Sequence, residues 1–150
     1  MGCCSLLAIQ QVRSVDPADR RDVDYDPFPD DPSIDVGCGY RELTDLLQMD
    51  QWIAAQREAE DRQPWAFDDP RRVAAQALVH FVGSSATSAA LEETRKAQGR
   101  VVYEWKPPRI DLTYMVVVSR PYLVTFYARD PNRIAWIAVA VYESSCERTE

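Results

Sequence analysis

The last third of the chain carries the clearest pattern of apolar and polar positions. Apolar residues alternate with polar ones, or run without interruption, at residues 100–105, 110–118, 122–128 and 134–142. Short segments of this kind, separated by turns that contain proline, are typical of β-strands. We therefore predict a four-stranded antiparallel meander over residues 100–142, whose last hairpin turns at Asp130-Pro131-Asn132-Arg133.

The last of these segments is apolar on both faces. In a regular strand, one face carries Ile134, Trp136, Ala138 and Ala140, and the other carries Ile137, Val139 and Val141. A strand that is apolar on both faces is typically covered on both sides. Residues 134–142 are therefore predicted to form a central strand of the sheet.

Two helices are predicted ahead of the meander. Apolar residues recur every three or four positions over residues 41–60 and again over residues 70–82. The second helix has terminal signals as well: Asp69 as N-cap, Pro70 at the first helical position and Gly83 at the end.

Two shorter elements complete the prediction. We expect a strand at residues 34–40 and a third helical piece that starts at Ser84 or Ser85, continues through Thr94 and stops at Gly99. The fold class is then α+β, with two to three N-terminal helices packed on one face of a C-terminal four-stranded antiparallel meander. The residues expected to pack against the face of Trp136, or of its alternate neighbours, are Leu46, Met49, Ile53, Ala74, Leu78 and Phe81.

Length and composition indicate one globular domain. The chain has 150 residues, of which 46% are hydrophobic and 27% charged, enough for a single core over residues 36–150. Residues 5–12 are apolar enough for an edge strand or a docked turn. We expect no membrane span, because no apolar run approaches about 20 residues, and no secretion leader, so the cytoplasm is the expected location.

The net charge of −7 is unevenly distributed. Residues 13–35 contain eight aspartates and three arginines, which gives −5, and four prolines that exclude a helix. This acidic arm is either a solvated linker or a strip that covers a basic surface. Its apolar residues Val23, Tyr25 and Phe28 offer groups with which it can dock.

The predicted strands have the opposite charge. Residues 100–133 contain six basic and three acidic residues, with tyrosines and tryptophans between them. Such a surface can bind an RNA strand or a protein, and the acidic chain as a whole favours a protein partner. We expect the arm to regulate access to this surface. The candidate partner-binding residues are Arg100, Tyr103, Arg109, Arg120, Tyr127, Arg129 and Arg133.

Residue types that carry catalysis or bind metals are scarce. The four cysteines, at positions 3, 4, 38 and 146, have no metal-binding spacing and are expected as reduced thiols. His80 is the single histidine and is expected to be a half-buried structural residue beside Val73. No nucleophile elbow or phosphate-binding glycine loop is present. We therefore predict no catalytic residue, no metal and no cofactor.

Several short motifs, in their order and spacing, resemble the RelE/ParE family of type II toxins. They are Asp45-Leu46, Trp52-Ile53-Ala54, Asp69-Pro70 with Ala74, Gly99-Arg100, Arg120-Pro121-Tyr122-Leu123-Val124 with Tyr127, and residues 134–141. The resemblance covers about residues 34–142. It implies a helical hairpin on an antiparallel sheet, a surface for ribosome-bound mRNA or gyrase, and a groove filled by an antitoxin.

The chain departs from that family in two respects. It is acidic where the family is usually basic, and its last predicted strand ends in Tyr142-Glu143, where many members carry histidine or arginine. A binding role is thus favoured over mRNA cleavage. Three functions follow: a toxin-like inhibitor of a nucleic-acid machine; a non-catalytic interaction protein such as an immunity protein, phage-encoded inhibitor or assembly subunit; and an NTF2-like or VirB8-like domain, which residues 136–142 also resemble.

Overall fold

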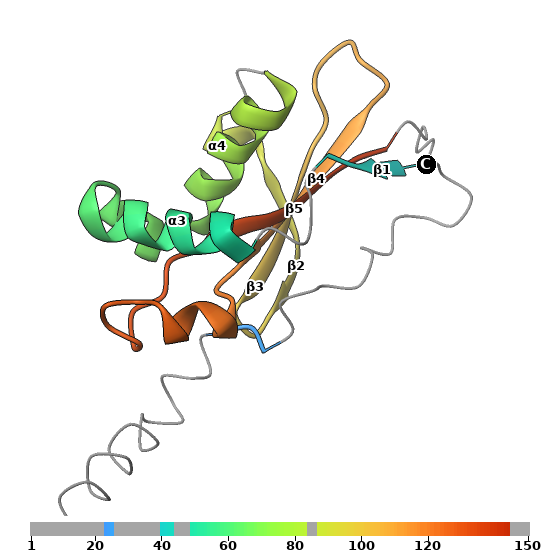
Figure 1. The fold of residues 1–150 in the computed structure, drawn as a ribbon. Helices are drawn as coiled ribbons and strands as arrows, with labels where there is room; N and C mark the ends of the chain where they lie inside the picture. Colours follow the sequence, from blue (N-terminus) through green and yellow to red (C-terminus); the bar gives the residue numbers. More distant parts are fainter. Residues whose placement is uncertain (1–22, 26–39, 44–48, 84–86, 145–150) are drawn as a thin grey trace, which may run out of the picture.

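The computed structural model describes residues 23–25, 40–43, 49–83 and 87–144. The elements are β1 (Tyr40–Glu42), α3 (Met49–Asp61), the 3-10 helix η1 (Pro64–Phe67), α4 (Pro70–Val82), η2 (Ser88–Ala90), β2 (Glu92–Ala97), β3 (Arg100–Trp105), β4 (Thr113–Ser119), η3 (Tyr122–Phe126) and β5 (Ile137–Ser144). The strands form one antiparallel sheet in the order β1-β5-β4-β3-β2 (Figure 1). The α+β prediction is confirmed, since two helices precede a four-stranded antiparallel meander, β2 to β5.

Several expectations concern residues outside the described part of the chain. They are the element at residues 5–12, most of the acidic arm, all four cysteines, Leu46, and the start of the third helical piece at Ser84 or Ser85. The strand predicted at residues 34–40 is described from Tyr40, where β1 begins. Of the helices described here, none is long and apolar enough to cross a membrane.

Helix α4 forms as its terminal residues predict. The Asp69 carboxylate accepts a hydrogen bond from the backbone N–H of Arg72 at 3.1 Å, and Pro70 occupies the first turn. At the other end Gly83 adopts φ +73, and its N–H donates to the carbonyl of Val79 at 3.0 Å. Both ends therefore satisfy backbone groups that a helix leaves unpaired.

The prediction of a helix from residue 41 is wrong at its start. Residues Tyr40–Glu42 form β1 on one edge of β5, and the Leu43 N–H donates to the Val141 carbonyl at 2.7 Å. Helix α3 begins at Met49. The physical reason is that β5 is buried. The backbone groups on the edge of β5 that faces away from β4 must also be hydrogen-bonded, and this pairing outweighs local helix propensity.

The predicted strand at residues 122–128 is instead the 3-10 helix η3. Its backbone bonds are local: the N–H of Val124 donates to the Pro121 carbonyl at 3.1 Å, and the N–H of Tyr127 to the Val124 carbonyl at 2.9 Å. The turn at Asp130 does form, but it joins η3 to β5 and closes no hairpin. Strand β4 is already paired with β3 and β5, so no sheet position next to it remains.

The helical piece expected through Thr94 is also corrected. A single 3-10 turn, Ser88–Ala90, precedes β2, which forms a hairpin with β3. All six β2 side chains are exposed, and four of them are charged. Its composition resembles an exposed helix, but as an edge strand the same charges hinder edge-to-edge association of sheets.

A β-bulge in β5 changes which of its residues share a face. Val117 pairs with Ala140 and Val118 pairs with Ala138, so Val139 is the extra residue. The alternation of side chains between the two sheet faces therefore shifts by one residue at Val139. Ala140 joins the cluster of Ile137 and Val139, while Val141 joins the opposite one, contrary to the predicted face assignment.

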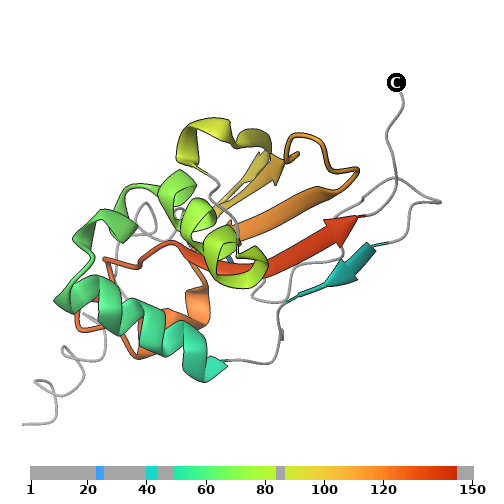
Figure 2. The same cartoon turned by 90° about the horizontal axis from the view of Figure 1, so that it is seen from above.

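The two helices contribute to different sides of the core. Ala74 and Leu78 of α4 pack with Val101, Val116 and Val118 on one sheet face. Trp52 and Met49 of α3 pack instead with the cluster of the other face, which also contains Val23 and Val124. Figure 2 shows α4 across the sheet and α3 beside the start of β5. The expectation that both helices pack on one face is therefore wrong.

Leu78 and Phe81 provide a test of this arrangement. Leu78 is completely buried, whereas Phe81 is 38% exposed, which corrects its assignment to the core. Leu78→Ala should lower the free energy of unfolding by about 2 to 5 kcal/mol, because it leaves a cavity. Phe81→Ala should cost less than about 1 kcal/mol. Urea unfolding followed by circular dichroism measures both, and similar costs would contradict the assignment of the α4 faces.

Candidate partner-binding site

A groove of about 820 Å³ lies between α3 and α4. Its floor is formed by the residues that lead into β5 and begin it, from Trp136 to Val139. Helix α3 contributes one wall, including Trp52 and Ala55, and α4 contributes the other, including Ala77 and Phe81. The helices are held apart by η1, whose Trp65 and Ala66 close one end of the groove.

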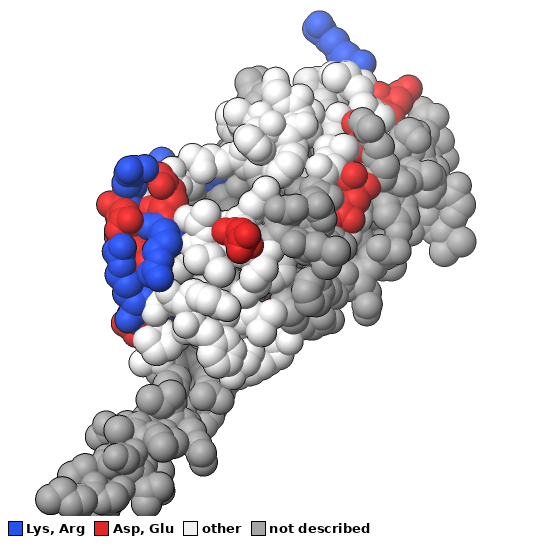
Figure 3. Space-filling view, in the orientation of Figure 1, with Lys and Arg blue, Asp and Glu red and all other residues white. Residues whose placement is uncertain are grey.

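The groove is mainly apolar, with a polar rim. Glu58 is the acidic residue of the lining, and Gln51, Gln63, Gln76 and His80 add polar groups. In space-filling view, the middle of the visible face is largely uncharged, and charged side chains gather at the left end of the molecule, over the C-terminal end of α3 (Figure 3). An apolar surface with a polar rim is the usual composition of a protein interface.

His80 and Phe81 stand at the α4 wall. His80 is exposed, and its ring contacts that of Phe81 edge-on with 4.7 Å between centroids. The expectation of a half-buried structural histidine is therefore wrong. Val79, on the same turn, is 49% exposed but does not line the groove.

Buried Gln56 connects α3 to the segment that leads into β5. Its side-chain nitrogen donates to the carbonyl of Arg133 at 3.0 Å and to Glu60 at 2.9 Å, and its oxygen accepts from the Ala135 N–H at 2.9 Å. Gln56 thereby satisfies the backbone of an irregular segment as a neighbouring strand would. Because Trp136 follows directly, these bonds position one end of the groove floor.

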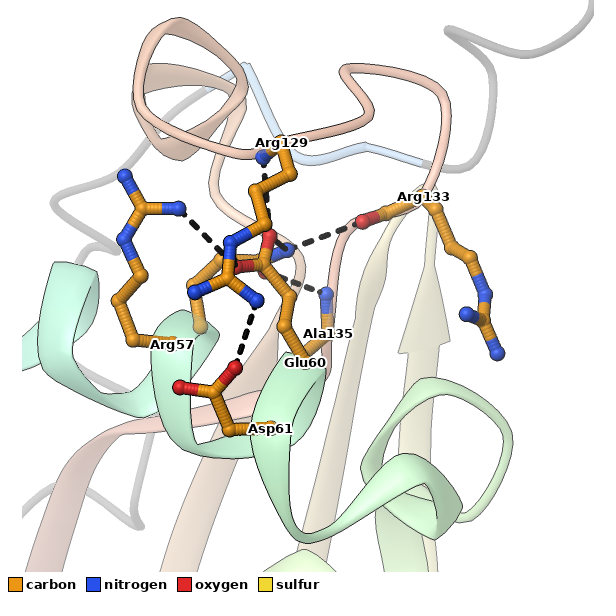
Figure 4. Close-up of polar contacts among 7 residues, drawn as sticks. Arg57, Glu60, Asp61, Arg129, Arg133 and Ala135 are labelled. Carbon is orange, nitrogen blue, oxygen red and sulfur yellow. Dashed lines mark hydrogen bonds and ion pairs between the residues drawn. The ribbon is translucent and has the colours of Figure 1, made fainter.

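Glu60 adds an ionic contact to the same junction (Figure 4). Its carboxylate accepts from the backbone N–H of Arg129 at 3.0 Å and from the Arg57 guanidinium at 3.0 Å. Burial raises the pKa of Glu60, but hydrogen bonds from Gln56, Arg129 and Arg57 outweigh it, so the pKa lies below its ordinary value. A carboxylate held ionised in this way supports structure rather than proton transfer.

The predicted basic residues do not form one surface. Arg129 pairs with Asp61 at 2.6 Å and with Glu60 at 3.5 Å, and the hydrogen bond and charge of Asp61 raise its pKa. Arg100 pairs with Asp24 of the arm at 2.7 Å. Much of the predicted positive charge is therefore neutralised within the molecule.

The remaining predicted residues are dispersed. Tyr103 is buried, with the Arg71 guanidinium 5.1 Å from its ring centroid, and burial raises its pKa. Arg109 is exposed at φ +66 between β3 and β4, and Tyr127 is half-exposed at the end of η3. None of these three residues lines the groove between α3 and α4.

Arg120 and Arg133 do come together. Both line a polar cleft of about 130 Å³ that also includes Asp68 and Asn132. The Arg133 guanidinium lies 4.1 Å from the Phe67 ring centroid, and that of Arg120 lies 4.4 Å from the Trp136 centroid and donates to the Phe67 carbonyl at 2.6 Å. Since aromatic rings cover one side of each guanidinium, both arginines act partly as packing residues.

Sequence reasoning missed the buried face of α3 and the residue that bonds it to the segment leading into β5. Trp52, Gln56 and Ala59 are the buried residues of α3, at a spacing of four and three residues. Gln56 at the centre of that stripe, with Glu60 one turn later, was an available signal, because a polar residue on a buried helix face requires a hydrogen-bonding partner. The bonding partners of Gln56 are the backbone groups of Arg133 and Ala135, 77 and 79 residues away, and the local pattern does not predict them.

Comparisons of the chain with protein-family models, characterised proteins and solved structures find no match. In the part of the chain that the structure covers, no three His, Cys, Asp or Glu side chains are grouped as a metal ion would require. The resemblance to RelE/ParE toxins rests on its motifs alone.

Glu60→Gln should reduce the loss of stability in acid. The lowered pKa means that the contribution of Glu60 is complete above the unfolded carboxyl value, about 4.3, and is lost as pH falls through the lower folded value. We expect wild type to lose more stability than the variant below about pH 5, measured by urea unfolding. Glu58→Gln is the control, because Glu58 makes an exposed ion pair with Arg62. Parallel pH profiles for wild type and Glu60→Gln would contradict the role of Glu60.

Proposed function

We propose that this chain is a non-catalytic binding protein, whose groove between α3 and α4 receives the apolar face of a helix from a protein partner. The observation that carries the proposal is the groove itself, with an apolar floor along β5 and the partly exposed Phe81 on its wall. Amphipathic helices bind proteins by laying an apolar face into such a groove. An exposed aromatic residue beside it is a typical energetic centre of an interface.

Charge indicates the chemistry of the partner. Asp50 lies exposed in the first turn of α3, Glu58 is on the rim in an exposed ion pair with Arg62, and the whole chain carries −7. A partner helix with lysine or arginine beside its apolar face would meet this charge favourably and associate faster. We therefore propose a basic amphipathic helix as the ligand.

A nucleic-acid ligand has less support. Phosphate binding requires accessible cationic groups, yet Arg100 and Arg129 form ion pairs and Tyr103 is buried, away from stacking. Arg109, Arg120 and Arg133 are not among the residues that line the groove. A protein partner is thus favoured over RNA.

Two classes of binding protein fit this proposal. A toxin-like protein, as the RelE/ParE resemblance implies, would inhibit a nucleic-acid machine and be silenced by the partner in the groove. An immunity protein, phage-encoded inhibitor or assembly subunit would bind without toxicity. Expression of the chain alone distinguishes them: growth arrest that a co-expressed neighbouring gene relieves supports the first, and normal growth supports the second.

The size of the groove favours a small apolar ligand as the second candidate. Ligand pockets commonly measure about 300 to 1,000 Å³, and the groove volume of about 820 Å³ lies within that range. This function corresponds to the NTF2-like or VirB8-like domain considered from the sequence. Native mass spectrometry of protein purified from its host would detect such a ligand.

Phe81→Glu and Val79→Glu form a matched pair for testing the groove. The probe is a synthetic amphipathic helix with a leucine face and flanking lysines, titrated by fluorescence anisotropy. Phe81→Glu places a charge on the groove wall and should weaken binding at least tenfold, which corresponds to about 1.4 kcal/mol. Val79→Glu adds the same charge on the same helix outside the groove and should have little effect.

The rim charge gives an independent check. Glu58→Lys should weaken binding of the lysine-flanked helix, and a glutamate-flanked helix should then bind better than it does to wild type. Equal weakening by Phe81→Glu and Val79→Glu would place the ligand elsewhere. Insensitivity to Glu58→Lys would exclude a basic partner while leaving the groove as the site.

A further inference from the structure

Three residues of the acidic arm occupy a slot where β3 begins and β4 ends, the blue segment in Figure 1. The Asp24 N–H donates to the Arg120 carbonyl at 2.7 Å, and the Tyr122 N–H donates to the Asp24 carbonyl at 2.8 Å. The two bonds form an isolated parallel bridge across Pro121. They hold the backbone at Asp24, between bends at Val23 and Tyr25, and do not depend on side chains, as in peptide binding through main-chain hydrogen bonds.

The slot also recognises the Asp24 carboxylate. Arg100 donates to both carboxylate oxygens, from Nε at 2.7 Å and from Nη2 at 3.1 Å, and the Ser119 hydroxyl donates at 3.0 Å. This two-pronged contact is specific for a planar anion. An asparagine in place of Asp24 would lack the negative charge that Arg100 binds. A glutamate there would place its carboxylate farther from the backbone bridge.

The neighbouring positions are recognised by shape. Val23 is buried among apolar residues of the core, and the Tyr25 ring contacts that of Tyr122 in a tilted arrangement, with 4.9 Å between centroids. Gly99 forms the floor of the slot: a Cβ there would lie 2.4 Å from the Val23 carbonyl carbon and 2.5 Å from the Asp24 nitrogen. A side chain at residue 99 would therefore collide with the backbone of the bound segment.

We propose that this slot is a peptide-recognition site for an apolar-Asp-aromatic segment, and that Val23–Asp24–Tyr25 fills it in cis as a displaceable substitute for the segment of a partner protein. The proposal is independent of the groove between α3 and α4. The binding energy comes from four separate features: the backbone bridge, the carboxylate contact, the apolar position and the aromatic contact.

The chain around the segment allows displacement. Residues 26–39 connect Tyr25 to β1. Strand β1 begins at the level of Thr113, at one end of β4, because Tyr40 and Thr113 both pair with Ser144. The slot adjoins Ser119, at the other end of β4. These points are about 20 Å apart along β4. The connecting residues, extended, can span up to about 46 Å, so the arm can leave without moving a strand. A tether of this length gives a local concentration in the millimolar range, which a partner segment must overcome.

The test uses the full chain and a fluorescent synthetic peptide of residues 19–29. Wild type should bind it weakly, because the cis segment competes. Asp24→Ala weakens the cis segment and should bind the peptide at least tenfold more tightly. The double variant Asp24→Ala/Gly99→Ala blocks the slot and should not bind. A peptide in which Asp24 is replaced by Asn should bind the Asp24→Ala protein at least tenfold less tightly than the unmodified peptide does.

Equal peptide affinity of wild type and Asp24→Ala would overturn the proposal, as would binding that survives Gly99→Ala. Hydrogen exchange of wild type gives a second measurement that needs no variant, should Asp24→Ala fail to fold. The amides of Asp24 and Tyr122 should exchange at least tenfold faster than that of Val116 in the central strand, because local release exposes them. Exchange at the same rate would mean that the segment opens only on global unfolding, and would refute displacement.

Discussion

The burial of β5 is the constraint on which the rest of the structure depends. The strand is hydrogen-bonded to β1 on one edge and β4 on the other, and side chains from both of its faces are buried. Unpaired backbone groups at such a position are costly, so residues 40–42 extend instead of continuing a helix. The same strand excludes residues 122–128 from the sheet, because it already occupies the free edge of β4.

The segment that enters β5 is held by side chains of α3. Gln56 and Glu60 bind the backbone between Arg129 and Ala135, and the Trp136 N–H donates to the Ala66 carbonyl of η1 at 2.9 Å. The groove floor and one of its walls are thus joined by hydrogen bonds. Such a connection keeps a binding surface formed in advance, which lowers the ordering cost of association.

The arginines show why composition alone overestimates a basic surface. Four of them stack on aromatic rings of the same chain: Arg71 on Tyr103, Arg72 on Trp65, Arg120 on Trp136 and Arg133 on Phe67. About two such contacts are usual for a chain of this length. These arginines therefore pack within the protein and do not add to a basic surface. Arg100 and Arg129 form ion pairs with residues that are 76 and 68 positions away in the sequence.

The sequence by itself determined the features whose causes are local. Helix α4, with Asp69 and Gly83 at its ends, the strand β3, the turn at Asp130 and the α+β class all follow from residues within a few positions of one another. Only the tertiary structure decided the strand β2, the 3-10 helix η3, the bulge at Val139, the groove and the slot for Asp24. Each of these depends on which distant segment competes for the same backbone hydrogen bonds or the same buried space, and a local pattern carries no record of that competition.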